Sequence, residues 1–139
     1  MIGILSKLFG GNKSEKDVKK IQPNVAKINE FFSQYQGLSN DQLRNKTQEF
    51  KARIKEHLAA IDEEIASKKA AAEALDSGDI SGRDDIYHEV DALKKDRDKQ
   101  IEEVLNNIMP EAFAVMKEAA RRFKENSTLE STATELDKT

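Results

Sequence analysis

The side chains that could do acid-base or metal chemistry are few and widely spread. The two histidines are His57 and His88, and the densest acidic runs are Asp62-Glu63-Glu64 and Asp84-Asp85. There is no cysteine, which removes thiolate catalysis, disulfides and cysteine-ligated zinc. The acidic runs also lack the spaced oxygen ligands and the glycine of a calcium loop. We therefore predict no catalytic, cofactor-binding or metal site, and expect these residues to lie on solvated helix faces.

These residues fall on two stretches in which apolar side chains recur at alternating steps of three and four. This is the spacing of a coiled-coil seam. A turn rich in Gly, Ser and Asp at 76–84 separates the two stretches. The pattern predicts an antiparallel helical hairpin over about residues 54–108. Its seam consists of Ile54, Leu58, Ile61, Ile65 and Leu75 on the first arm, and Ile86, Val90, Leu93, Ile101, Val104 and Ile108 on the second.

If Leu75 faces Ile86, the same register brings Ile54 to Ile108 at the other end of the hairpin. It also places the two histidines about 24 Å apart along the arms, too far to share a metal. Lys68 and Arg97 occupy seam positions, where long basic side chains keep their charge in water and help to set the register.

An amphipathic helix is predicted before the hairpin, at about residues 14–36. Pro23 interrupts its apolar stripe, so the helix either kinks there or starts afresh. Gly37 follows in the position of a left-handed cap. Ser39 and Gln42 then have the spacing of a capping box, at the start of a helix that can run unbroken into the first arm.

Pro110 is expected to stop or restart the second arm, because the residue before a proline avoids the helical region. Residues 110–124 are then predicted to form a separate helix with a buried stripe made of Phe113, Met116, Ala120 and Phe123. From Asn126 onward the sequence predicts a disordered tail. The fold class predicted from all these patterns is all-α.

The first nine residues place Ile2, Leu5, Leu8 and Phe9 on one side of a short helix, with Lys7 opposite. Such a segment can lie on a membrane surface or fill a partner's groove, and the alternative is a disordered terminus that happens to be apolar. Its apolar run is too short for a signal peptide or a membrane span.

Charge is distributed unevenly along the chain, whose net charge is -3. Residues 1–53 carry ten basic against five acidic side chains, whereas residues 54–108 carry eight against fifteen. The basic leading segment can approach an acidic lipid surface, but phosphate backbones would repel the hairpin. We therefore expect no nucleic-acid partner.

Two segments resemble a known family. Residues 38–54, LSNDQLRNKTQEFKARI, resemble the LSDEEL..KT.EF..R(L/I) stretch near the N-terminus of SecA, the motor ATPase family of bacterial protein secretion. Residues 109–122, MPEAFAVMKEAARR, are similar to the (L/I/M)PEAFA.V.EA..R helix that follows it. Residues 1–10 and 21–29 also resemble the opening of that family.

The resemblance implies a domain organisation. A short linker joins the two motifs in most of the family, so residues 55–108 are an inserted hairpin between scaffold helices at 13–54 and 109–125. Residues 1–12 are then an amphipathic N-terminal segment. No glycine is followed by lysine, so the family's GxxxxGKT phosphate-binding loop is absent, and residues 126–139 read as a tail cut before the nucleotide-binding motifs.

The resemblance also implies a function: the N-terminal piece of an ATP-driven subunit that moves preproteins through the SecY channel. This piece would supply docking and scaffold without catalysis, with ATP and Mg²⁺ bound only by the full-length protein. The location implied is cytoplasmic and peripheral on the cytoplasmic face of the bacterial inner membrane. From the residues alone, the alternative is a free-standing coiled-coil adaptor or holdase. The residues implicated in contacts with anionic lipid, the channel or a homodimer partner are Ile2, Leu5, Lys7, Leu8 and Phe9.

Overall fold

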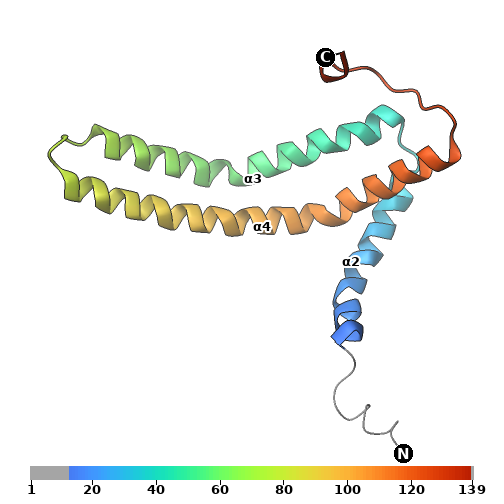
Figure 1. Ribbon diagram of the computed structural model, residues 1–139, viewed down its shortest axis with the longest axis horizontal. Helices are drawn as coiled ribbons and strands as arrows, with labels where there is room; N and C mark the ends of the chain where they lie inside the picture. Colours follow the sequence, from blue (N-terminus) through green and yellow to red (C-terminus); the bar gives the residue numbers. More distant parts are fainter. Residues whose placement is uncertain (1–12, 139) are drawn as a thin grey trace, which may run out of the picture. The chain divides into compact units, whose positions relative to one another are not determined.

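The computed structural model describes residues 13–138, and its regular structure is helical (Figure 1). In this range there are three α-helices, α2 (Lys13–Tyr35), α3 (Asn40–Ala74) and α4 (Ile80–Glu125), followed by a short 3-10 helix, η1 (Glu135–Lys138). No strand occurs among these residues, and the predicted all-α fold is confirmed. The predicted lipid and channel contacts at residues 2–9 lie outside the described range.

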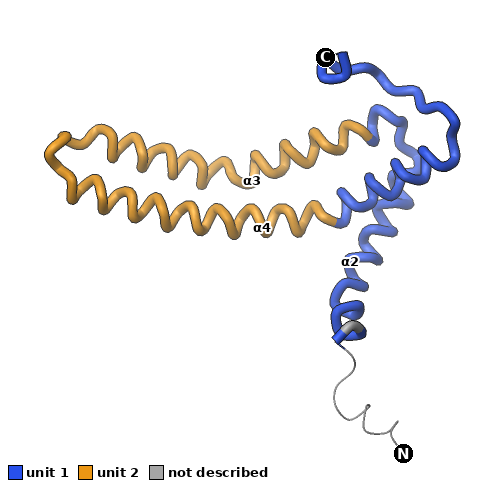
Figure 2. The backbone as a smooth tube through the Cα atoms, in the orientation of Figure 1, with its two compact units in different colours: residues 1–43, 110–139 blue, residues 44–109 orange. Residues whose placement is uncertain are grey.

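The chain divides into two compact units (Figure 2). The hairpin unit is Arg44–Met109, and the terminal unit combines Met1–Leu43 with Pro110–Thr139. Of the terminal unit, residues 13–43 and 110–138 are described. The hairpin unit begins earlier in α3 than the insertion at 55–108 expected from the sequence.

The hairpin unit has a narrow apolar core at the seam between α3 and α4. Leu58, Ile61, Ile65 and Val90 form one buried cluster. On α3, the residues between the seam positions are exposed from 55 to 74. Burial of one such aliphatic side chain contributes about 1.5–3 kcal/mol, so the seam is the main source of stability in this unit. Further seam residues pack against the cluster or are buried beside it: Ile54, Leu93, Ile101, Ala72, Val104 and Ile108.

Two ion pairs join the arms in an antiparallel sense. Arg97 donates from Nε to Oδ1 of Asp62 at 2.5 Å, and Lys68 pairs with Glu89. Lys68 is nearer the turn than Asp62 on α3, and Glu89 is nearer the turn than Arg97 on α4. The hydrogen bond from Arg97 holds the pKa of Asp62 below its ordinary value, and the bond to Glu89 raises the pKa of Lys68. These exposed pairs favour the antiparallel register more than they stabilise the fold.

Side-chain caps define the turn between the arms. Asp79 accepts a hydrogen bond from the Gly82 N–H at 3.0 Å, which is an N-cap for α4. Arg83 donates to the carbonyl of Leu75 at 3.3 Å, just beyond the end of α3. Because Asp79 caps the helix, α4 begins at Ile80, earlier than the arm predicted from Ile86.

Both prolines lie inside helices. The prediction that Pro110 separates a helix at 110–124 from the second arm is wrong, and α2 does not start afresh near Pro23. A proline removes one N–H, and the carbonyls left without that donor belong to Lys19 and Asn106, both exposed residues that water can reach. A proline inside a helix costs about 3 kcal/mol, and we expect the packing of the rest of each helix to offset this cost.

None of the helices within residues 13–138 combines the length and apolar character that a membrane crossing requires.

Candidate functional site

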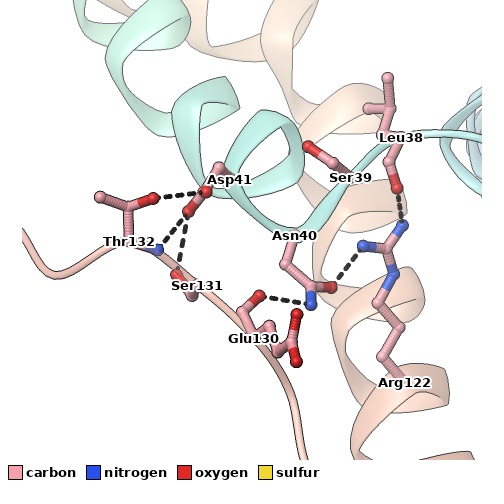
Figure 3. A pocket seen from close by; sticks show the side chains of 8 residues that line it. All are labelled: Leu38, Ser39, Asn40, Asp41, Arg122, Glu130, Ser131 and Thr132. Atoms are coloured by element: carbon pink, nitrogen blue, oxygen red, sulfur yellow. Dashed lines mark hydrogen bonds between the residues drawn. The ribbon is translucent and has the colours of Figure 1, made fainter.

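The terminal unit brings the end of α2, the start of α3 and the end of α4 together around Arg122, at a site we call the junction (Figure 3). An apolar cluster beside it contains Tyr35, Leu43 and Ala114, all buried. The small side chain of Ala114, with no exposed surface, leaves room for aromatic rings of α2. Other members pack against these three: Ile28, Phe31, Phe32, Leu38, Val115 and Ala119.

Arg122 is the centre of the junction and is only 7% exposed. Its Nε donates to Glu118 Oε1 at 2.7 Å, and its Nη1 donates to Asn40 Oδ1 at 2.7 Å. Its Nη2 donates to the carbonyls of Leu38 at 2.7 Å and Tyr35 at 3.3 Å. One planar guanidinium therefore binds the last carbonyl of α2 and the Leu38 carbonyl in the turn that follows, and it holds the first residue of α3.

The end of α2 differs from the prediction at Gly37. That residue does not have the positive φ of a left-handed cap. Instead the Leu38 N–H donates to the Tyr35 carbonyl at 3.1 Å, and Arg122 donates a second hydrogen bond to the same carbonyl from another helix. A tertiary contact thus replaces the local cap.

The start of α3 has the predicted capping box. The Ser39 N–H donates to Gln42 Oε1 at 2.8 Å, and the Gln42 N–H donates to Ser39 Oγ at 3.1 Å. This prediction is confirmed, and the reciprocal bonds orient the two residues that follow Ser39.

The residues after α4 have no regular structure until η1, but hydrogen bonds hold them at the start of α3 (Figure 3). Asp41 accepts from the Thr132 N–H and from Thr132 Oγ1, each at 2.8 Å, and from Ser131 Oγ at 3.1 Å. Asn40 Nδ2 donates to the carbonyl of Glu130 at 2.7 Å. The sequence predicts a disordered tail here; the structure instead gives an irregular segment with specific partners.

Glu118 is fully buried and ionised by its neighbours. Arg121 donates to both of its oxygens, at 2.8 and 2.7 Å, and Arg122 donates a third hydrogen bond. These bonds hold the pKa of Glu118 below its ordinary value, with Arg121 the larger cause, although burial acts in the opposite direction. A carboxylate with three such donors is a fixed structural anion and is poorly suited to exchange protons with a substrate.

The buried face of α4 in the terminal unit is not the predicted one. Phe113, Met116 and Phe123 are 57%, 69% and 74% exposed, whereas Glu118 and Arg122 are buried. At 3.6 residues per turn, positions 116 and 118 lie on opposite sides of a helix. The prediction took the largest apolar side chains as the core, but the rings of α2 pack on the face with the alanines.

A second set of exposed apolar residues lies on α2. Val18, Ile21 and Val25 are 60%, 56% and 45% exposed, and they share one helix face by their spacing. We call them the α2 stripe, and we call Phe113, Met116 and Phe123 the α4 stripe. Both stripes leave apolar side chains exposed within the described part of the chain.

The titratable residues singled out from the sequence are not brought together. His57 is exposed, and His88 lies 3.6 Å from Asp84 on its own helix. Within residues 13–138 no three His, Asp or Glu side chains are grouped as a metal site. Glu118 and Arg122 were missed as site residues; their spacing of four, within an alanine-rich stretch, was the available signal.

Taken together, the fold and junction define a helical scaffold in which buried ionic groups hold helix ends. The model of the SecA DEAD-like domain family matches residues 5–132, and the chain belongs to this family. No solved structure matches the chain significantly.

The curated relatives include three named as protein translocase subunit SecA. The protein from Christiangramia forsetii is 47% identical over 132 residues, which is 95% of this chain. Those from Flavobacterium psychrophilum and Cytophaga hutchinsonii are 46% and 42% identical over 137 residues. Alignments that cover 95% or more of this chain also take in sequence of the hairpin unit. The chain spans only 12% of the length of each of the three.

Proposed function

We propose that this chain is the N-terminal scaffold segment of a SecA-type translocase subunit, an ATP-driven protein that moves preproteins through a SecY-type channel. The observation that carries the proposal is the 47% identity over 132 residues to a protein translocase subunit SecA. Nothing in the comparisons favours the adaptor or holdase alternative.

The scaffold role follows from the exposed stripes of the terminal unit. In the α4 stripe, Met116 and Phe123 each expose more than two thirds of their surface, which is unfavourable for a side chain without a partner. We propose that the remainder of a longer protein covers these residues. The aligned relatives are about eight times longer than the matched segment, so such a remainder is available in them.

Membrane docking is assigned to residues 1–9 on sequence grounds. Ile2, Leu5, Leu8 and Phe9 supply an apolar face, and Lys7 supplies a cation for anionic lipid. This segment would also contact the channel and a second copy of the protein. The protein would then act in the cytoplasm and peripherally on the cytoplasmic face of the inner membrane.

ATP and Mg²⁺ would bind outside this segment. The described residues contain no cluster of acidic or histidine ligands for a metal, and the chain has no phosphate-binding GxxxxGKT loop. The residues present do not fit Mg-ATP, and the segment's part in the cycle is positioning.

A segment exchange tests the proposal. Residues 1–139 of this chain would replace the aligned segment of the Christiangramia forsetii relative, and ATP-dependent preprotein import into inverted membrane vesicles would be measured. We expect import to be retained, and to be lost when the exchanged segment carries Arg122→Met. A correctly folded exchange protein without import would contradict the proposal.

The docking assignment has its own test. Binding of the chain to vesicles that contain anionic lipid would be compared with and without residues 1–9, with neutral vesicles as the control. We expect the deletion to weaken binding at low salt. Unchanged binding would remove residues 1–9 from the docking surface.

A further inference from the structure

A continuous series of hydrogen bonds leads from Leu38, in the turn after α2, to the segment after α4 (Figure 3). Arg122 binds the Tyr35 and Leu38 carbonyls with one nitrogen and the Asn40 side chain with another. The same Asn40 side chain then binds the carbonyl of Glu130. Each bond in the series apart from that to Tyr35 is 2.7 Å long.

We propose that residues 130–132 form a strap whose attachment to α3 is coupled, through Asn40 and Arg122, to the position of the end of α2. A shift of that end would change how firmly the strap is held. The inference concerns the mechanics of the terminal unit and does not rest on the proposed translocase function.

The coupling follows from the geometry of one amide group. Asn40 Oδ1 accepts from Arg122 Nη1, which fixes the side-chain amide so that Nδ2 points at the Glu130 carbonyl. Without the arginine donor, nothing in this series holds the amide in that orientation. The strap bond to Asn40 therefore depends on a residue that does not itself bond to residues 130–132.

The strap is also poised to open. Glu130, Ser131 and Thr132 are exposed, so the groups released on opening meet water directly. Its strongest attachment is the Asp41 carboxylate, which accepts three hydrogen bonds from Ser131 and Thr132. Charged hydrogen bonds hold such a segment firmly, while its lack of burial lets it detach without unfolding the helices.

Hydrogen exchange at the Thr132 amide, measured by NMR on the 139-residue chain, tests both the attachment of the strap to α3 and its coupling to Arg122. Asp41→Ala removes the acceptor and should speed this exchange by about tenfold or more. Asn40→Asp keeps the Oδ1 acceptor for Arg122 but loses the donor to Glu130, and should speed it about threefold to tenfold. Arg122→Lys should speed Thr132 exchange by a similar factor, although residue 122 does not itself bond to residues 130–132.

Two matched variants serve as controls. Asn45→Asp makes the same chemical change on an exposed residue of α3, and Arg53→Lys makes the same change as Arg122→Lys on another exposed residue of that helix. Both should leave Thr132 exchange unchanged. Exchange at the Ala114 amide, in the core of the terminal unit, reports that this unit remains folded in every variant.

Two results would overturn the proposal. If Asp41→Ala leaves Thr132 exchange as in the wild type, residues 130–132 are not strapped. If Asp41→Ala accelerates exchange but folded Arg122→Lys and Asn40→Asp do not, the strap exists without coupling to α2.

Discussion

The hairpin unit and the terminal unit differ in how they bury their apolar side chains. In the hairpin unit each arm supplies the apolar partner of the other, so Ile61 and Val90 are buried within one cluster. In the terminal unit the α4 stripe is exposed and the buried residues include a charged pair, Glu118 and Arg122. The first unit buries its seam between its own two arms, whereas the second leaves the α4 stripe exposed within the described residues.

The two units also use arginine differently. Arg97 lies at the edge of the hairpin seam and pairs with exposed Asp62. Arg122 is buried and bonds groups from three helices. Removal of a buried guanidinium leaves its buried partners unsatisfied, whereas water can solvate the partner of an exposed one, so substitutions at these two positions should differ strongly.

The largest effect is expected from a charge in the hairpin seam. Ile61→Asp buries a carboxylate without a partner and should destabilise the hairpin by about 4 kcal/mol or more. Circular dichroism would show lower helicity and a lower melting temperature. Ala60→Asp, at an exposed neighbouring position, is the control. Equal melting temperatures for the two variants would contradict a paired hairpin.

The next effect is expected at the junction. Arg122→Met keeps the length of the side chain but leaves Glu118 with one arginine and the Leu38 carbonyl without its donor, at a cost of about 3 kcal/mol. Lys124→Met, an exposed neighbour, should be nearly neutral. Chemical denaturation followed at Tyr35 measures the stability of both variants. Equal denaturation midpoints would argue against a stabilising role of Arg122 in the junction.

Acid should weaken the terminal unit through Glu118. Its pKa in the folded state is depressed, so its stabilising contribution is present above the unfolded pKa of about 4.3 and is lost as the pH falls through the lower folded value. Denaturation midpoints of the wild type should therefore drop below about pH 4. Glu118→Gln should lack this part of the dependence; an unchanged profile would show that other groups cause it.

Removal of the exposed ion pair between the arms should matter less. Asp62→Asn should lower the melting temperature by at most about 3 °C at low salt, because solvent already screens the pair. The difference from the wild type should vanish at about 1 M salt. A larger, salt-independent loss would mean that the pair does more than favour the register.

The smallest effect is expected at the α4 stripe. Phe123→Ser changes a side chain that is 74% exposed, so the isolated chain should keep its stability within about 0.5 kcal/mol. Phe32→Ser, in the apolar cluster, should cost about 2 kcal/mol or more. Similar losses of stability for the two variants in urea denaturation would show that the α4 stripe is packed within this chain.

Features whose causes are local, or whose partner lies in the same chain, could be predicted from the sequence. The seam positions recur at helical spacing because each arm buries its stripe on the other, as Leu58 and Val90 do. The capping box at Ser39 and Gln42 needs only residues three apart. The antiparallel arrangement follows from one turn.

Features set by tertiary partners could not be predicted in the same way. The left-handed cap expected at Gly37 is replaced by donors from Arg122, which lies far away in the sequence. The buried face of α4 was misassigned because side-chain size favoured Phe113 over Ala114. Pro110 predicts a break because its local cost is evident from the sequence, whereas the packing that offsets this cost is not.

The contrast between the two units can be measured directly, because the chain has no native cysteine. Single Ile61→Cys and Met116→Cys variants would be labelled with a thiol reagent, in the 139-residue chain as a monomer and in a longer translocase that carries the segment. We predict rapid labelling at position 116 in the chain alone, labelling at least about 100-fold slower at position 61, and protection of position 116 in the longer protein. Equal labelling rates at the two positions in the monomeric chain would contradict the contrast between a buried hairpin seam and an exposed α4 stripe.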